Sequence, residues 1–321
     1  MSSAAPVAPV APAAPVIPMS VMRRWYMYQR ERFPLLAHAP IIFAFSAGGV
    51  LYSARLRQPG PGASSTSLAV AFITCLLFFF QLRVADEYKD AEEDALHRPY
   101  RPVPRGLVTI AQLTRLAIGS AAIQLLLALW LDARLVALLL LVWGYMALMK
   151  VEFWSHGWLS TRPVAVIATH MLVMPLIDLY ATACDWIVHG AGVAPGLRWF
   201  LIASFFNGVV IEVGRKIRAP ESEERGVVTY TAAWGSRRAL AAWLAAMMMT
   251  GACAAAAAHS IHALTLTVTV LGVILTLAVS ASIAFVMLPT ARRARLVPAL
   301  SGAWTIAMYV TVGIIPGLRA G

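Results

Sequence analysis

The segment at residues 86–106 crowds six carboxylates and four cations into a chain that is only 13% charged overall. Asp86, Asp90 and Asp94 recur at every fourth position, which on an α-helix places them along one stripe about 12 Å long. Like charges at this spacing repel one another, so the stripe needs a counter-charge. Carboxylate oxygens are ligands that Mg²⁺ prefers. The spacing therefore predicts a Mg²⁺ site.

Cations follow the acidic stripe directly. Arg98 and Arg101 lie in a proline-rich stretch that prevents a regular helix and keeps the backbone extended. Arginine forks bind phosphate oxygens in a bidentate manner. Because Mg²⁺ commonly bridges protein carboxylates to substrate phosphates, acids followed by arginines indicate a site for a metal-bound diphosphate.

A second charged segment, at residues 212–238, reads differently. It offers Glu212 as a further metal-binding carboxylate, followed at once by Arg215 and Lys216, which we expect to bind the diphosphate directly. Both charged segments end in a similar phrase, RGLVT at residues 105–109 and RGVVT at residues 225–229. We expect its threonine to cap the next helix, and the repetition hints at two related halves.

Long apolar runs must position these loops. The chain is 60% hydrophobic, and several runs reach the roughly 20 residues that an α-helix needs to cross a bilayer core. Open backbone groups have no partners in lipid, and the runs lack the period-2 alternation of a β-barrel. We predict an all-α polytopic membrane protein with about nine transmembrane helices around a central cavity. The spans are placed at 38–54, 66–86, 110–131, 133–150, 163–184, 197–213, 237–258, 263–287 and 297–316.

The distribution of charge predicts the orientation. With the N-terminus inside, 20 of the 26 Lys and Arg residues fall on the inner side, as cytoplasmic loops require. The net charge of +11 reflects this asymmetry and indicates contact with membrane lipid, not with nucleic acid. Residues 1–20 are rich in proline and alanine and are predicted to form a disordered cytoplasmic tail before a transmembrane domain at 21–321.

Polar side chains inside the spans are further candidates, because ionisable groups in hydrocarbon usually line a cavity. His170 and Asn207 are candidates of this kind. Asp178 lies deeper and is expected to form a hydrogen bond between helices.

At these residues the chain resembles the UbiA superfamily of intramembrane prenyltransferases. Its first motif, NxxxDxxxD followed by RPxxxG, matches with Asp86 at the Asn position, Asp90 and Asp94 at the Asp positions, and Arg101, Pro102 and Gly106 in the loop. The resemblance implies Mg²⁺-dependent transfer of a prenyl group from a prenyl diphosphate to a lipophilic, often aromatic acceptor. In a bacterium the protein would lie in the cytoplasmic membrane, with its active-site loops facing the cytoplasm.

The resemblance also implies roles for Tyr145 and Lys150, which lie near the family's catalytic tyrosine and lysine but with one residue more between them. Given an acceptor, we expect His170 and Asn207 to contact it. The chain departs from the family in its second motif, where the usual aspartate series is missing, which puts a second carboxylate-bound Mg²⁺ in doubt. Two alternatives stay open: a UbiA-type terpene cyclase that needs no acceptor, and a non-catalytic transporter or scaffold. The sequence does not define the acceptor, the prenyl chain length or the oligomeric state.

Overall fold

The computed structural model of the chain describes residues 19–224 and 227–318, and within these ranges every regular element is a helix, as predicted. Eight helical segments of this described part are long and apolar enough to cross a bilayer core. A ninth apolar helix, α6 (Leu135–Lys150), occupies the predicted fourth span but is shorter. The predicted count of nine is therefore approximate. Residues 1–18 of the predicted tail lie outside the described residues.

The spanning segments are of two kinds. Six are single helices: α2 (Leu35–Leu56), α3 (Ser65–Lys89), α5 (Ile110–Leu131), α10 (Leu197–Arg215), α12 (Ser236–His259) and α13 (Leu264–Met287). Two are interrupted: α8 (Pro163–Met171) continues into α9 (Val173–Trp186), and α14 (Ala291–Ala294), α15 (Leu296–Tyr309), the π-helical turn η3 (Val310–Ile314) and α16 (Ile315–Leu318) form the last. The short elements outside these segments are α1 (Val21–Arg32), which precedes the first of them, and α4 (Ala91–His97), η1 (Glu152–Trp154), α7 (His156–Leu159), η2 (Pro220–Ser222) and α11 (Tyr230–Trp234).

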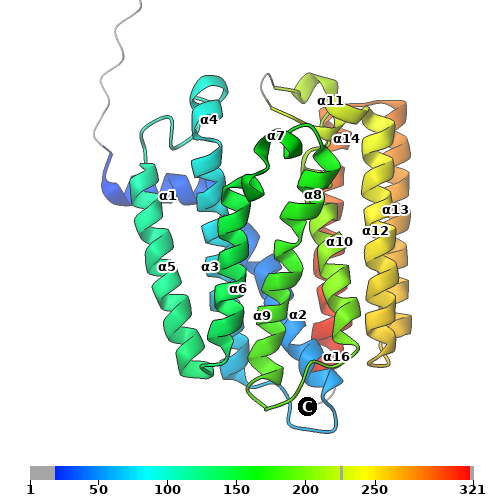
Figure 1. Ribbon diagram of the computed structural model, residues 1–321. Helices are drawn as coiled ribbons and strands as arrows, with labels where there is room; N and C mark the ends of the chain where they lie inside the picture. The colour runs from blue at the N-terminus through cyan, green and yellow to red at the C-terminus, as the bar shows by residue number, and fades with distance from the viewer. Residues whose placement is uncertain (1–18, 225–226, 319–321) are drawn as a thin grey trace, which may run out of the picture.

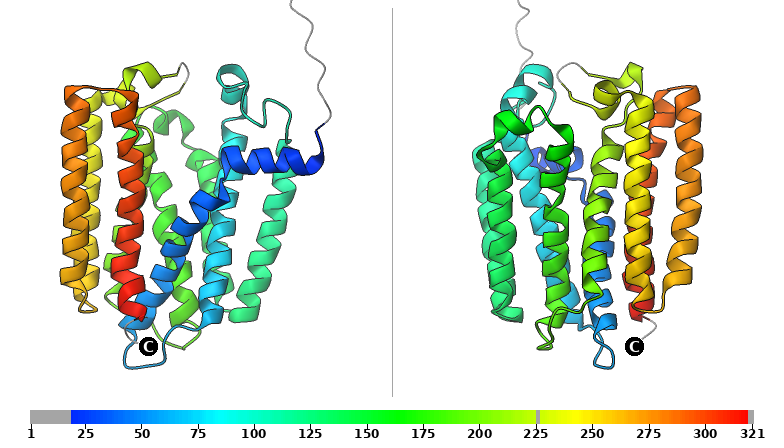
Figure 2. Two further views of the ribbon diagram at one scale, coloured as in Figure 1. Left: turned by 180° about the vertical axis from the view of Figure 1, so that it is seen from behind. Right: turned by 45° about the vertical axis from the view of Figure 1, so that its right-hand side comes forward.

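The helices stand side by side in one bundle (Figure 1). The connections that carry α4, α7 and α11 gather at one end, and the described C-terminus lies at the other end. Helix α1 lies across the bundle at the end where these connections gather (Figure 2). The charged segments at residues 86–106 and 212–238 are thus brought to the same end of the bundle.

Local signals in the sequence explain where helices begin and bend. Thr109 caps α5 in a capping box with Gln112, and Thr229 caps α11, which confirms the role predicted for both threonines. Arg225 and Gly226 of the second phrase lie outside the described residues. Between α8 and α9 the fifth span is interrupted at Leu172, since the ring of Pro175 removes a helical hydrogen bond and clashes with the preceding turn.

Close contact between backbones fixes the last segment against α2. A Cβ atom built on Gly313 would lie 2.1 Å from the carbonyl oxygen of Gly48, so the two segments approach this closely only with glycine there. Next to this contact, the hydroxyl of Tyr309 donates to Asp178 at 2.8 Å, from α15 to α9. This interaction is the helix–helix hydrogen bond expected for Asp178.

An ion pair ties α2 to α9 at the end of the bundle opposite the charged connections. Asp185 is fully buried, and Arg57 donates to its two carboxylate oxygens at 2.7 and 3.2 Å. Ser53 donates to the same carboxylate at 2.8 Å. Breaking a buried pair by removing one partner leaves an uncompensated charge, which is strongly destabilising.

We therefore expect Arg57→Gln to lower the free energy of unfolding by about 3–5 kcal/mol, because Asp185 stays buried without its cation. The midpoint of thermal unfolding in detergent measures this loss. Arg55→Gln, which removes the same charge from a neighbouring arginine that forms no ion pair in the described residues, is the control. Equal midpoints for the two variants would contradict a structural role for the pair.

Candidate active site

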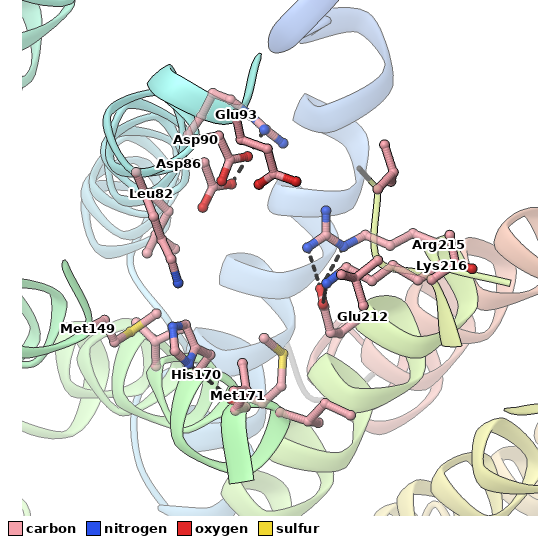
Figure 3. A pocket seen from close by; sticks show the side chains of 18 of the residues that line it. Leu82, Asp86, Asp90, Glu93, Met149, His170, Met171, Glu212, Arg215 and Lys216 are labelled. Carbon is pink, nitrogen blue, oxygen red and sulfur yellow. Dashed lines mark hydrogen bonds and ion pairs between the residues drawn. The ribbon is translucent and has the colours of Figure 1, made fainter. Parts of the chain in front are cut away.

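A cavity of about 510 Å³ opens at the end of the bundle where the charged connections gather. The ends of α3 and α10 form two facing walls, and α8 with the start of α9 forms the base (Figure 3). Eight cationic and four acidic side chains line it: Arg32, Arg83, Lys89, Arg98, Arg101, Arg215, Lys216 and Arg218, with Asp86, Asp90, Glu93 and Glu212. Apolar side chains, three of them methionines, line its deeper part. The cavity is therefore electropositive at its mouth and apolar below.

Asp86 and Asp90 lie one helical turn apart on the first wall and both line the cavity, with Glu93 of α4 beside them (Figure 3). Burial and the neighbouring carboxylates, Asp86 first and then Asp94, raise the pKa of Asp90 above its ordinary value. Arg83 forms a long ion pair with Asp86, with 3.4 Å between Arg83 Nη1 and Asp86 Oδ2. The negative charge at this wall is thus only partly compensated by the protein.

Asp94 does not join this wall, contrary to the predicted stripe. Its carboxylate is only 2% exposed, and Arg101 donates to both of its oxygens at 2.6 and 2.8 Å. Arg98 forms a second ion pair with it at 2.9 Å. The helix is interrupted at Asp90, between α3 and α4, so the register of the stripe is lost one turn before Asp94. Asp94 positions the two arginines, and both arginines line the cavity.

The second wall is built around Glu212, near the end of α10. Arg215 Nε lies 2.6 Å from one of its carboxylate oxygens, and Lys216 Nζ lies 2.9 Å from the other. All three side chains line the cavity, and they face Asp86 and Asp90 across it (Figure 3). Because Glu212 already binds two cations, its carboxylate is engaged by the protein, and the wall as a whole carries a positive charge.

Lys150 and Tyr145 lie outside the cavity lining, so the structure does not bring them to the other site residues. The ammonium group of Lys150 lies 4.1 Å from the centre of the Tyr88 ring. The hydroxyl of Tyr145 donates to the carbonyl oxygen of Thr169 at 2.5 Å. The additional residue between them places Lys150 beyond the cavity, at the end of α6.

Lys89 lines the cavity instead and was missed by the sequence analysis. It pairs with Glu152, which also binds His156. Although partial burial acts to raise it, hydrogen bonds from Lys89 and His156 hold the pKa of Glu152 below its ordinary value. Glu152, Phe153 and Trp154 all have positive φ angles, a strained conformation for residues other than glycine. No sequence pattern indicates such a turn.

Three other cations of the lining, Arg32, Arg83 and Arg218, were also missed. Arg32 belongs to α1 and pairs with the buried carboxylate of Glu87, so a segment far away in the sequence contributes to the cavity. Only the fold brings this residue to the site, whereas Arg83 lies one turn before Asp86 and was identifiable from its spacing.

The structure places only one of the two residues predicted to contact an acceptor, His170 and not Asn207, in the lining of the cavity. His170 lies at the base of the cavity, near Met149 and Met171 (Figure 3). Its Nδ1 atom lies 3.0 Å from the carbonyl oxygen of Val166, which only accepts, so Nδ1 is the donor in this contact. Its Nε2 atom is buried without a hydrogen-bond partner in the described protein. Asn207 is buried away from the cavity lining, where its side-chain oxygen accepts a hydrogen bond from Thr305 at 3.1 Å.

Glu223 and Glu224, which follow Pro220, do not line the cavity and form contacts with other residues of the same connection. Glu223 accepts from Thr229 and Thr231, whereas Glu224 pairs with Arg218 at 3.1 Å. Within the described ranges, the protein alone gathers no group of three metal-binding side chains.

The fold defines the class: an α-helical membrane protein whose cavity joins carboxylates and cations at one end of the bundle. Residues 39–313 match the UbiA prenyltransferase family, and the chain belongs to this family. No curated protein sequence matches the chain significantly.

Solved structures share the fold at low sequence identity. A UbiA homolog from Aeropyrum pernix K1 in its apo form has a TM-score of 0.65 and 15% identity, over 86% of this chain and 96% of that chain. A structure described for digeranylgeranylglyceryl phosphate synthase in membranes has a TM-score of 0.60 and 12% identity, over 94% and 100%. A UbiA homolog from Archaeoglobus fulgidus bound to DMAPP and Mg²⁺ has a TM-score of 0.51 and 14% identity, over 89% and 98%.

The different surroundings of Asp90 and Asp94 generate a prediction. Asp94→Asn leaves Arg98 and Arg101 without their buried counter-charge and should lower the free energy of unfolding by about 3–5 kcal/mol. Asp90→Asn removes repulsion with Asp86 and should leave the thermal midpoint unchanged or raise it. Thermal unfolding of both variants in metal-free detergent solution measures the difference. Equal losses of stability would mean that the two aspartates have the same role.

Proposed function

We propose that the protein transfers a prenyl group from a prenyl diphosphate to a lipophilic acceptor, with Mg²⁺ and within the membrane. The observation that carries this proposal is the cavity itself: two carboxylates face a cationic wall at its mouth, and apolar side chains line its depth. A prenyl diphosphate has the same polarity, with an anionic head and an apolar tail. By the distribution of Lys and Arg, the mouth faces the cytoplasm.

The first wall fits Mg²⁺. Asp86 and Asp90 offer carboxylate oxygens. Burial first, and then the neighbouring carboxylates, raise the pKa of Asp90, and a cation at this wall would offset both effects. Two protein carboxylates with substrate phosphates are a common Mg²⁺ arrangement. When bound, Mg²⁺ neutralises charge that develops on the departing diphosphate. The relative from Archaeoglobus fulgidus, bound to DMAPP and Mg²⁺, supports the same cofactor here.

The second wall supplies cations for the diphosphate. Arg215 and Lys216 bind phosphate oxygens from one side, and Arg98 and Arg101 are oriented by Asp94 on the other. Lys89 completes the set, since Glu152 holds it at the cavity. Such fixed cations stabilise the leaving group where its charge develops, and the low dielectric of the site strengthens their effect.

The reaction breaks the bond between C1 of the prenyl chain and the diphosphate oxygen, and the electron pair leaves with the diphosphate. A nucleophilic atom of the acceptor forms the new bond to C1 and loses one proton. The apolar lower cavity holds the chain and excludes water from the electron-deficient carbon. His170 lines the cavity and its Nε2 atom has no hydrogen-bond partner in the described protein, so it is our candidate for contact with the acceptor, whereas Asn207 lies outside the lining.

The test of this proposal is diphosphate release from allylic prenyl diphosphates in nanodiscs, with the organic products identified. Asp86→Ala and Asp90→Ala should each reduce turnover strongly, because Mg²⁺ loses a ligand. Near wild-type turnover in both variants would exclude the metal role. A cyclic hydrocarbon or alcohol formed without acceptor would indicate a terpene cyclase, and absence of any turnover would indicate a transporter or scaffold.

The second wall yields a separate prediction. Lys216→Gln removes a hydrogen bond to a charged ligand and should weaken prenyl diphosphate binding by about 1.5–3 kcal/mol. Glu212→Gln should be mild at saturating Mg²⁺, because it leaves both cations in place. The Michaelis constants of the two variants measure the difference. The reverse order would mean that Glu212 binds a second metal ion.

A further inference from the structure

A second, apolar groove of about 460 Å³ lies on the outside of the bundle. Helix α1 covers one end of it, and α3 and α5 form its sides, with Phe80 and Leu116 among the lining residues. Gly119 and Ser120 of α5 leave space where larger side chains would fill the groove. The proposed prenyl transfer uses none of these residues.

One charged residue lines this groove. Arg115 is exposed, and no carboxylate in the described part of the chain pairs with it. It belongs to the second turn of a membrane-spanning helix, where arginine is costly unless its charge finds a partner. Its Nε atom lies 3.4 Å from the carbonyl oxygen of Ala111, so the side chain points toward the start of α5. Long cationic side chains reach the membrane interface in this way.

Helix α1 places the end of the groove at the membrane surface. It lies across the bundle at the end of α5 that bears Thr109 (Figure 2). Trp25 and Gln29 of α1 line the groove, while Arg23 and Arg30 are exposed on the same helix. A basic helix in the plane of the interface attracts anionic headgroups, and tryptophan is enriched at this depth.

We propose that this groove binds an anionic phospholipid, with its phosphate at Arg115 and an acyl chain along the apolar groove. The charge is complementary: the groove presents an arginine without a protein partner at the level where lipid phosphates lie. The shape is complementary as well, since the lining below the arginine is apolar.

The lipid would stabilise α1 in its place. Tyr28 of α1 lines the groove, and Arg32, one turn further along, lines the catalytic cavity and pairs with Glu87. A lipid that packs against α1 on one side therefore supports a cation of the cavity on the other. Loss of the lipid should loosen α1 without removing any residue that touches the diphosphate.

Native mass spectrometry tests the proposal with protein taken from membranes of mixed phosphatidylcholine and phosphatidylglycerol. Wild-type protein should retain phosphatidylglycerol, and Arg115→Gln should reduce the retained amount about fivefold, which corresponds to one arginine at the interface. Gly119→Leu should do the same by filling the groove, and it is sterically acceptable because a Cβ atom there meets nothing within 4 Å. In both variants, hydrogen exchange at α1 should become faster.

Arg238→Gln is the matched control, because this exposed arginine at the start of α12 lies outside the groove. It should retain phosphatidylglycerol as the wild type does. Wild-type retention in Arg115→Gln and Gly119→Leu would overturn the proposal, as would an equal loss in Arg238→Gln or equal retention of phosphatidylcholine. Recovery of a neutral isoprenoid that only Gly119→Leu displaces would also contradict it.

Discussion

Repulsion between two carboxylates that the protein leaves without a full counter-charge is the interaction on which the site depends. Asp86 and Asp90 lie one turn apart at the mouth of a cavity whose depth is apolar. Arg83 lies 3.4 Å from Asp86, and the other arginines on this side are engaged elsewhere: Arg98 and Arg101 bind Asp94, and Arg32 binds Glu87. A divalent cation is the simplest partner that neutralises both carboxylates. Once bound there, it attracts the phosphate oxygens of an anionic ligand.

The opposite wall has the complementary imbalance. Two cations share the single carboxylate of Glu212. On the first wall, Lys89 at the end of α3 is held at the cavity by Glu152 from the connection after α6. These pairs orient the cations before any ligand binds, so little reorganisation is needed when an anion arrives. The membrane bundle supplies the frame, because the ends of α3 and α10 lie at the same end of the bundle and face each other across the cavity.

Much of this arrangement follows from the sequence because it depends on local rules. Hydrophobic length predicts the helices, threonine caps predict where α5 and α11 begin, and acids followed by arginines predict the polarity of the site. Asp94 was predicted on one stripe with Asp86 and Asp90. A spacing of four residues gives one stripe only while the helix continues, and because this helix is interrupted at Asp90, the structure places Asp94 against Arg98 and Arg101. Lys89 and Arg32 were missed because their positions depend on partners in other segments, Glu152 in a strained turn and Glu87 against α1.

Calorimetric titration of wild-type protein with inorganic diphosphate, with and without Mg²⁺, tests the central claim most directly. The two carboxylates repel a free diphosphate, and they attract it once a divalent cation lies between them. The account therefore predicts that Mg²⁺ tightens diphosphate binding, and that Asp90→Asn removes most of this gain while leaving the Mg²⁺-free affinity equal or higher. Diphosphate affinity that is independent of Mg²⁺ in the wild type would contradict it.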